Sequence, residues 1–481
     1  RETQPSGYLS AGAIPGTVSG TATGSTVSGN PDVLTEINIP LGNQHGIHYD
    51  FAEYLPIELS GYVYFDANNN GIYEPGESPI PGTTVILQDA SGTQVAQQLT
   101  DQNGFYKFSG LSAGKYCVVE IQPAGWLDGK DAAGKIAGVT VGQADNPGDK
   151  IRNVNLNWGD IGVHYDFGEL RPASIAGRVF VDPNEDCLFN GSDRPLAGTT
   201  VQLLNSQGTV VQTTQTDADG RYRFDNLLPG TYAVRELQPS GYLQGGTVPG
   251  TGGGNASVQD LISAIEIASG AQLVEYNFCE LEPVSIAGRV FVDLNNNCLF
   301  DGQEQPLAGV KIELLDGNGI VVASTFTNSL GQYRFDQLRP NNYSVRELQP
   351  SGYFQGGQVA GSFGGDDSVN DFIQDVNLFS GNHAVEYNFC EQPAGSISGY
   401  VFRDGPPIVT PDGLVPLNLY DIRDGQLTPD DQRLGGVLLE LRFSGTADLV
   451  TAADVLPGVY ASGPLRVRTD ADGYYEFVGL P

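Results

Sequence analysis

One unit of sequence recurs along this chain of 481 residues, and the repetition constrains the fold more than any other feature. Four equivalent segments begin at Asp66, Asp182, Asp293 and Asp404, which stand 116, 111 and 111 residues apart. A unit of this length is large enough to bury its own hydrophobic core. We therefore expect a tandem array of similar domains rather than one large domain.

The repeat divides the chain into three complete copies and two partial ones. The complete copies, named copy 1, copy 2 and copy 3 below, are residues 57–170, 171–281 and 282–392. Residues 1–56 form the C-terminal half of a copy, because Arg1–Tyr8 resembles Arg235–Tyr242. Residues 393–481 form the N-terminal part of a further copy, which contains an insertion.

The partial copies at the two ends have two explanations. They either belong to a longer polypeptide of similar units, or they complement each other head to tail between subunits, as in donor-strand assembly. The strand equivalent to Gly230–Val234 is missing from both ends. Its absence would leave a slot in a complemented sandwich, so we expect the longer polypeptide.

Short runs of alternating apolar and polar residues predict β-strands throughout each copy. In copy 2, Tyr222 and Phe224 alternate with arginines, which gives the strand one buried and one solvent-exposed face. The 64 glycines and 29 prolines suit many short strands joined by turns. The pair Asn103 and Gly104 predicts a tight hairpin with positive φ angles.

The segment that begins at each repeated aspartate carries oxygen atoms at a spacing that suits calcium. Asp66–Glu77 matches the pattern D-x-[DN]-x-[DN]-G-x5-E at every specified position. Side-chain oxygens at positions 1, 3, 5 and 12, with a backbone carbonyl at position 7, supply the hard oxygen ligands that Ca²⁺ takes. Predicted strands flank the loop on both sides. The same residues also form good turns, which is the competing interpretation.

The predicted calcium ligands occupy positions 1, 3, 5, 7, 9 and 12 of the loop. They are Asp66, Asn68, Asn70, Ile72, Glu74 and Glu77 in copy 1, Asp182, Asn184, Asp186, Leu188, Asn190 and Asp193 in copy 2, and Asp293, Asn295, Asn297, Leu299, Asp301 and Glu304 in copy 3. In the C-terminal partial copy they are Asp404, Asp424 and Asp431, with an insertion after the first. Further loops begin at Asp101, Asp217 and Asp470, where a hairpin turn is a better interpretation than a metal site.

The net charge disfavours several classes of partner. With 57 acidic and 24 basic residues, the formal net charge is −33. Such a chain repels nucleic acid and anionic membrane surfaces, and it attracts cations. No run of sequence approaches the roughly 18 apolar residues of a membrane helix, so we expect no membrane span.

Four of the five cysteines occur as two equivalent pairs. Cys187 and Cys279 are 92 residues apart, and so are Cys298 and Cys390. Copy 1 has glycine at both equivalent positions, so a copy has both cysteines or neither. We predict a disulfide in copy 2 and another in copy 3, and hence an oxidising, extracellular setting. The alternative is pairs of buried thiols that co-occur through duplication, while Cys117 is expected to be a small core residue.

Four motifs in a fixed order resemble a known family. They are D-x-N-x-N-G-x5-E, L-x-G-V-x-V-x-L, T-D-x-x-G-x-Y-x-F and L-x-P-G-x-Y-x-V-x-E-x-x-P-x-G-Y. Over essentially the whole chain they resemble the B domains of bacterial serine-aspartate-repeat surface proteins (SdrD B-like domains). The resemblance implies an all-β tandem array of seven-stranded Cna-B/prealbumin-like β-sandwich domains with calcium loops, in a cell-surface stalk or fibre.

One departure from the Cna-B pattern concerns its isopeptide bond, which joins a lysine to an asparagine beside an activating acid. The first-strand positions hold no lysine but Tyr62, Arg178, Arg289 and Tyr400. Asn277 and Asn388 stand in the last strand at a position that suits the asparagine of this bond. Glu236 and Glu347 stand at a possible position for the activating acid. Without an amine the bond cannot form, and the disulfide is a possible substitute crosslink.

Three classes of function are considered: a structural repeat, an adhesin and an enzyme. An extracellular, Ca²⁺-stabilised structural repeat has neighbouring repeats or copies of itself as partners in a stalk or fibre. A cell-surface adhesin binds a protein or glycan ligand through variable segments such as 245–257, 356–368 and 405–423, but these are poor in the Tyr, Trp and Arg that carry recognition. No nucleophile elbow, phosphate loop or zinc motif supports an enzyme. We expect the structural role.

Overall fold

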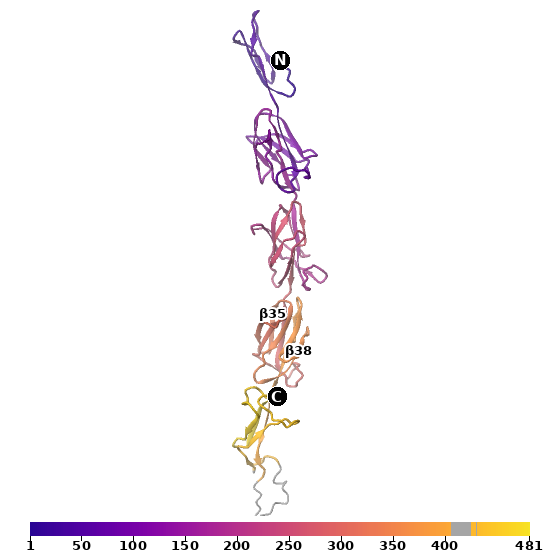
Figure 1. Ribbon diagram of the computed structural model, residues 1–481, viewed down its shortest axis with the longest axis vertical. Coiled ribbons are helices and arrows are strands. Elements are labelled where there is room, and N and C mark those ends of the chain that lie inside the picture. Colours follow the sequence, from indigo (N-terminus) through magenta and orange to yellow (C-terminus); the bar gives the residue numbers. More distant parts are fainter. Residues whose placement is uncertain (406–424, 430) are drawn as a thin grey trace, which may run out of the picture. The chain divides into compact units, whose positions relative to one another are not determined.

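The protein consists of β-strands and turns throughout residues 1–405, 425–429 and 431–481, which the computed structural model describes. No helix occurs in this part of the chain (Figure 1). Each complete copy buries its own cluster of apolar side chains. The all-β expectation and the tandem arrangement of β-sandwiches are confirmed.

Copy 1 is a sandwich whose first and last strands lie side by side. The first strand, β8 (Ile57–Phe65), has alternating burial because apolar and polar residues alternate along it. It pairs antiparallel with β11 (Phe105–Leu111) and parallel with the closing strand β19 (Phe167–Leu170). The facing sheet has the order β10-β9-β12-β17-β16. Its strands are β9 (Thr84–Asp89), β10 (Gln94–Leu99), β12 (Gly114–Glu120), β16 (Gln143–Asp145) and β17 (Lys150–Leu156).

Copy 3 repeats this arrangement. Its first strand β31 (Val284–Val292) pairs antiparallel with β35 (Gln332–Leu338) and parallel with β41 (Asn388–Pro393). The facing sheet has the order β34-β33-β36-β39-β38. Its strands are β33 (Lys311–Asp316), β34 (Val321–Phe326), β36 (Asn341–Glu347), β38 (Asp366–Val369) and β39 (Phe372–Leu378).

Copy 2 has the same elements. Its first strand β20 (Ala173–Val181) pairs antiparallel with β24 (Arg221–Leu227). One of its sheets has the order β23-β22-β25-β28-β27. The strands of this sheet are β22 (Thr200–Asn205), β23 (Val210–Gln215), β25 (Gly230–Glu236), β27 (Asn255–Val258) and β28 (Leu261–Ile267).

Further strands complete the three copies. In copy 1 they are β13 (Leu127–Asp128), β14 (Lys135–Ile136), β15 (Val139–Thr140) and β18 (Ile161–Val163). In copy 2 they are β21 (Arg194–Pro195), β26 (Leu243–Val248), β29 (Gln272–Leu273) and β30 (Asn277–Leu281). In copy 3 they are β32 (Gln305–Pro306), β37 (Tyr353–Val359) and β40 (His383–Ala384).

The partial copies contain fewer paired strands. In the N-terminal one, β1 (Leu9–Ile14) pairs with β7 (Asp50–Tyr54), and β2 (Thr17–Val18), β3 (Thr21–Ala22), β4 (Ser25–Val27), β5 (Asn30–Thr35) and β6 (Gly46–Ile47) accompany them. In the C-terminal one, β42 (Gly395–Tyr400) pairs with β47 (Tyr474–Leu480), β43 (Phe402–Arg403) with β44 (Gln432–Arg433), and β45 (Leu438–Glu440) with β46 (Arg466–Arg468).

A tyrosine and a glycine fix the crossing of the first and last strands in each copy. In copy 3, the Tyr333 hydroxyl donates a 2.6 Å hydrogen bond to the carbonyl of Tyr387. A Cβ atom on Gly288 would lie 1.8 Å from the same carbonyl oxygen, so only glycine fits. The equivalent pair in copy 1 is Tyr106 and Gly61.

Two details differ from the sequence expectations. The turn at Asn103 and Gly104 is tight, but it joins β10 and β11, which belong to different sheets, so it is not a hairpin; only Gly104 has a positive φ there (68°). The Asp101 carboxylate caps this turn by accepting hydrogen bonds from the Asn103 and Phe105 amides. Cys117 is a free, half-buried thiol rather than a core residue, because it points to the face of β12 opposite that of Tyr116.

Candidate metal centre

The loop of copy 1 draws its oxygen atoms together around its first aspartate. Asp66 is buried at the end of β8, where its Oδ1 accepts a 3.1 Å hydrogen bond from the Asn70 amide and its Oδ2 a 2.7 Å bond from the Gly71 amide. The amide of Ile72 donates to Asn70 Oδ1 at 2.7 Å. The Glu74 amide donates to Glu77 Oε2 at 3.0 Å. The loop is therefore folded around its own carboxylates.

The same contacts recur in the other loops. The amide at position 6 donates to the aspartate at position 1 from Cys187 to Asp182 (2.6 Å) and from Cys298 to Asp293 (2.7 Å). The amide at position 9 donates to the acid at position 12 in both loops, from Asn190 to Asp193 (2.7 Å) and from Asp301 to Glu304 (3.3 Å). Repeated sequence positions thus make repeated hydrogen bonds.

Position 6 has a left-handed backbone in each of these loops. Its φ angle is 75° at Gly71 and 53° at both Cys187 and Cys298. Glycine suits this conformation, whereas cysteine adopts it with some strain. The cysteines therefore occupy this position for a reason other than backbone preference.

The cysteines at position 6 form disulfide bonds. Cys298 forms a disulfide with Cys390 of β41, with an S–S distance of 1.96 Å and a Cα–Cα distance of 5.5 Å. Cys187 and Cys279 are also disulfide-bonded. The predicted bond of copy 3 is confirmed, and it attaches the loop to the closing strand.

The acidic groups of the copy 2 loop lie close enough to share a cation. In copy 2, one carboxylate oxygen from each of Asp182, Asp186 and Asp193 lies within 4.8 Å of the others. Burial raises the pKa of Asp182, and the neighbouring charges of Asp193 and Asp186 raise it further. In copy 3, burial opposes the ionisation of Asp293, but hydrogen bonds from several backbone amides lower its pKa overall.

The C-terminal partial copy keeps part of this pattern. The Gly425 amide donates a 2.9 Å hydrogen bond to Asp404 Oδ2, as position 6 does in the other loops. Asp431 Oδ2 accepts a 2.7 Å bond from the Thr428 amide, as position 12 does. Asp424 lies outside the residues that the structure describes.

These loops fit a hard divalent cation. In copy 1 the side-chain oxygens of Asp66, Asn68, Asn70, Glu74 and Glu77 and the carbonyl of Ile72 would hold Ca²⁺, which takes six to eight oxygen ligands. The side-chain Nδ2 atoms of Asn68 and Asn70 donate hydrogen bonds of 3.1 and 3.2 Å to Glu74 Oε2. The ion would supply the positive charge that balances the carboxylates of Asp66, Glu74 and Glu77.

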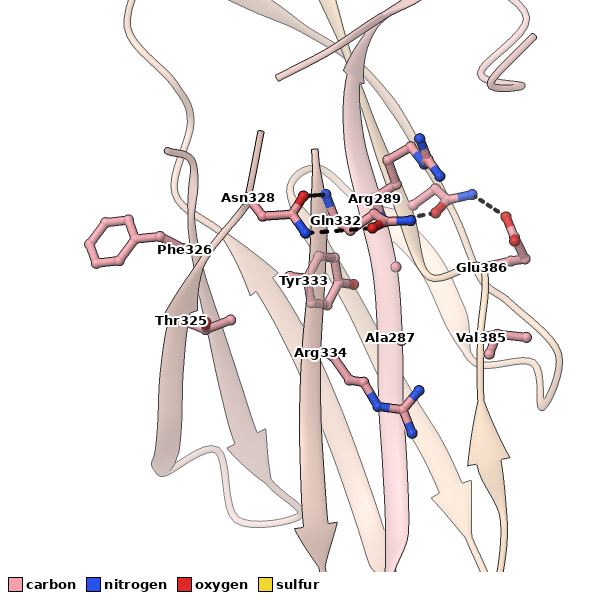
Figure 2. Close-up of a pocket in the computed structure, with 12 residues that line it drawn as sticks. Ala287, Arg289, Thr325, Phe326, Asn328, Gln332, Tyr333, Arg334, Val385 and Glu386 are labelled. Carbon is pink, nitrogen blue, oxygen red and sulfur yellow. Dashed lines mark hydrogen bonds between the residues drawn. The ribbon is translucent and has the colours of Figure 1, made fainter. Parts of the chain in front are cut away.

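The position of the isopeptide bond in Cna-B domains holds a hydrogen bond in copy 3. Asn388 Oδ1 accepts a 2.9 Å bond from the Arg289 amide, and its Nδ2 donates a 2.9 Å bond to Glu386 (Figure 2). These residues line a surface pocket of about 510 Å³ with Gln332 and Arg334. Asn388 therefore lies where the sequence predicted, beside the first strand.

Sequence reasoning missed a second group of acidic residues, which lies inside copy 1. Glu120, Asp149 and Glu169 each place one carboxylate oxygen within 4.8 Å of the other two. The signal was present in the sequence, because Glu120 directly follows the apolar residues Val118 and Val119 in a strand. An acid at the end of such a strand is unusual unless a partner compensates its charge.

Comparison with known proteins assigns the family. The profile of the SdrD B-like domain matches residues 57–171, 173–275 and 284–389. The chain belongs to the SdrD B-like family. Its three matches fall on copies 1 to 3 and include the loop of each copy, and the first match also includes Glu120, Asp149 and Glu169.

The curated relatives of this SdrD B-like chain are considerably longer. Serine-aspartate repeat-containing protein D of Staphylococcus aureus (strain Newman) is 30% identical over 379 residues, which is 76% of this chain and 28% of the relative. Serine-aspartate repeat-containing protein F of Staphylococcus epidermidis is 29% identical over 356 residues, which is 71% of this chain and 19% of the relative. The chain thus spans less than a third of either protein.

Solved structures resemble the SdrD B-like chain more weakly. The major pilin subunit BcpA of Bacillus cereus is 12% identical with a TM-score of 0.30, over 70% of this chain and 99% of that one. The family membership places the chain outside the cell, at the cell surface, in agreement with its disulfide bonds. Within the described residues, no helix has the length and apolar character needed to cross a membrane.

Proposed function

We propose that this chain is a structural segment of a cell-surface stalk or fibre, and that Ca²⁺ bound in its loops stabilises each copy. The observation that carries the proposal is the hydrogen bond from position 6 to the aspartate at position 1. It occurs in all three complete copies and again between Gly425 and Asp404, in spite of the insertion between these two residues. The first carboxylate of each loop is thus held in the same place, beside the acidic residues that follow it in the loop.

Electrostatic repulsion explains why the ion stabilises the fold. Three carboxylates within 4.8 Å of one another, as in the loop of copy 2, repel each other until a divalent cation neutralises them. An ion that binds the folded loop and not the unfolded chain stabilises the copy by mass action. The stability of each copy should therefore depend on the concentration of Ca²⁺.

A mechanical role suits the way in which the loop is anchored. In copy 3 the Cys298–Cys390 disulfide attaches the loop to β41, the strand that leads out of the copy. Tension entering through β31 and leaving through β41 would act on two parallel, directly paired strands. A covalent bond and a bound ion at this place would resist their separation.

Small-angle X-ray scattering of the full chain tests the proposal, combined with a binding screen. We expect EDTA to increase flexibility between copies and to change the scattering profile. We also expect no saturable binding in a glycan array or a protein pull-down. An unchanged profile would contradict the calcium-dependent stalk, and a saturable ligand would instead support an adhesin that binds through its variable segments.

A further inference from the structure

The missed group of acidic residues in copy 1 lies where the two sheets of the sandwich meet. Glu120 is the last residue of β12, and Asp149 directly precedes β17, both in one sheet. Glu169 belongs to β19, which pairs with β8 in the other sheet. The Glu120 amide donates a 3.0 Å hydrogen bond to the carbonyl of Asp149, so the backbone itself holds these two residues together.

Two of these carboxylates are buried, and four of the six oxygens of the group lack a hydrogen-bond partner within the part of the chain that the structure describes. Glu120 is 2% exposed and Glu169 is 0% exposed. Among the described residues, neither oxygen of Glu120 has a hydrogen-bond partner, and the same holds for one oxygen each of Asp149 and Glu169. The other oxygen of Glu169 accepts a hydrogen bond from Gln122. Burying a carboxylate costs several kcal/mol unless a partner offsets it.

Two further aspartates extend the group. Asp131 is 5% exposed, and within the described chain neither of its oxygens has a hydrogen-bond partner. One oxygen of Asp128 lacks a partner in the same way, while the other accepts a 2.7 Å bond from the Gly148 amide. Burial and the neighbouring carboxylates Asp128 and Glu169 raise the pKa of Asp131 to about 9. Exposed Lys150 offsets part of this negative charge at Asp149.

Copy 3 provides an internal comparison. Glu347, Asp371 and Glu391 occupy the equivalent positions, and Glu347 is again bonded through its amide to the carbonyl of Asp371 (2.9 Å). The positions of Asp128 and Asp131 hold the neutral Gln355 and Gln358 in this copy. Copy 1 therefore has five carboxylates where copy 3 has three.

We propose that Glu120, Asp149 and Glu169, together with Asp128 and Asp131, form a second and buried site for a divalent cation with oxygen ligands, Ca²⁺ in the first place. The site is separate from the loop of Asp66–Glu77, since its ligands come from both sheets and from the segment between β12 and β17. A Ca²⁺ ion takes oxygen ligands of this kind and would offset their buried charge. Because the three acids of copy 3 lack the two additional aspartates, the site of copy 1 binds the ion more tightly.

The competing explanation is a proton shared between Glu120 and Glu169. Counting bound ions on the full chain separates the two explanations. Equilibrium dialysis against ⁴⁵Ca²⁺ should show that Glu120→Gln lowers the number of tightly bound ions by one and that Asp66→Asn lowers it by a different one. The double variant should lose two ions. Glu58→Gln, which alters an exposed ion pair with Lys107 in the same copy, should lose none.

The near-ultraviolet circular dichroism of each variant shows whether it has folded. A folded Glu120→Gln variant that binds as many ions as the original chain would overturn the proposal and support the shared proton. If Glu120→Gln does not fold, Asp131→Asn decides, because copy 3 already has an amide at that position. We expect at least a tenfold weaker affinity for one ion, and an unchanged affinity would overturn the proposal. If Asp66→Asn lost no ion while Glu120→Gln lost one, the loop site would be contradicted and the buried site supported. The two claims are therefore tested separately.

Discussion

The amide nitrogen of Asp66 donates a hydrogen bond of 2.9 Å to the carbonyl oxygen of Glu169, which attaches the first residue of the loop to the closing strand of its copy. Asp293 and Glu391 make the same bond at 2.8 Å in copy 3. The loop and the buried acidic group therefore lie on either side of one backbone contact. A structural change in the loop should therefore alter the position of the closing strand, which carries Glu169 of the buried acidic group.

The loop of copy 3 should lose its ion when its first aspartate is removed. Asp293→Ala removes the carboxylate oxygens that are predicted to bind the ion. The same carboxylate accepts hydrogen bonds from the Asn296 and Cys298 amides. At a Ca²⁺ concentration 100 times the dissociation constant, the bound ion contributes about 2.7 kcal/mol, which this variant should lose. Isothermal titration calorimetry should count one ion fewer per chain.

A matched control lies in the same copy. Asp316 caps a turn by accepting hydrogen bonds from the amides of Asn318 and Ile320, at 2.9 Å each. Asp316→Ala should lower the stability of the turn and leave the number of bound ions unchanged. If both variants lost an ion, the effect would come from the fold and not from the loop.

The disulfide of copy 3 should stabilise that copy strongly. It closes a segment of 92 residues, for which the chain-entropy model gives about 4 to 5 kcal/mol. Replacing Cys298 and Cys390 together by alanine should therefore lower the unfolding temperature of copy 3. Copy 1, which has glycines at both places, provides the comparison within the same calorimetric trace. Peptide mapping without reduction that found Cys298 or Cys390 as a free thiol would contradict the assignment.

An ion pair on the facing sheet should give copy 3 a specific dependence on pH. Glu313 accepts hydrogen bonds from Lys311 at 2.8 Å and from Arg346 at 2.5 Å, and both lower the pKa of its carboxyl group. A lowered pKa means that the stabilisation is present above the pKa of the unfolded chain and is lost as the pH falls through that of the folded chain.

The test compares Glu313→Gln with the original chain by thermal unfolding across the acid range. Copy 2 already has glutamine at this position, Gln202, which accepts hydrogen bonds from Arg235. The variant should therefore fold, be less stable at neutral pH, and match the original below the lowered pKa. A difference that grew as the pH fell would contradict this account.

A single methyl group at the strand crossing should disrupt copy 3. Gly288→Ala would place Cβ 1.8 Å from the Tyr387 carbonyl oxygen, so the paired strands would have to move apart. We expect a loss of about 3 kcal/mol or more. Gly317→Ala is the control, because its Cβ would lie 3.6 Å from the nearest atoms and its φ angle is not positive. Equal effects of the two substitutions on the unfolding temperature would contradict the packing argument.

Local patterns predicted those features that depend on local chemistry. Alternating residues such as Tyr222 and Phe224 gave the strands, and equal spacing gave the Cys298–Cys390 pair, because both follow from neighbours along the chain. The turn at Asn103 was predicted as a hairpin, since sequence does not tell to which sheet the strand after a turn belongs. The buried acidic group was not predicted, because Glu120 and Glu169 are far apart in sequence and only the packing of the two sheets brings them together.

Differential scanning calorimetry of the full chain in Ca²⁺ and in EDTA tests the central claim most directly. The loops of copies 1 to 3 should each bind an ion only when folded, so we predict higher unfolding temperatures in Ca²⁺. Replacing Asp66, Asp182 and Asp293 together by alanine should remove the part of this increase that the loops contribute, which is the whole increase in a copy without a further site. Superimposable traces in Ca²⁺ and EDTA for the original chain would contradict the claim that calcium stabilises these copies.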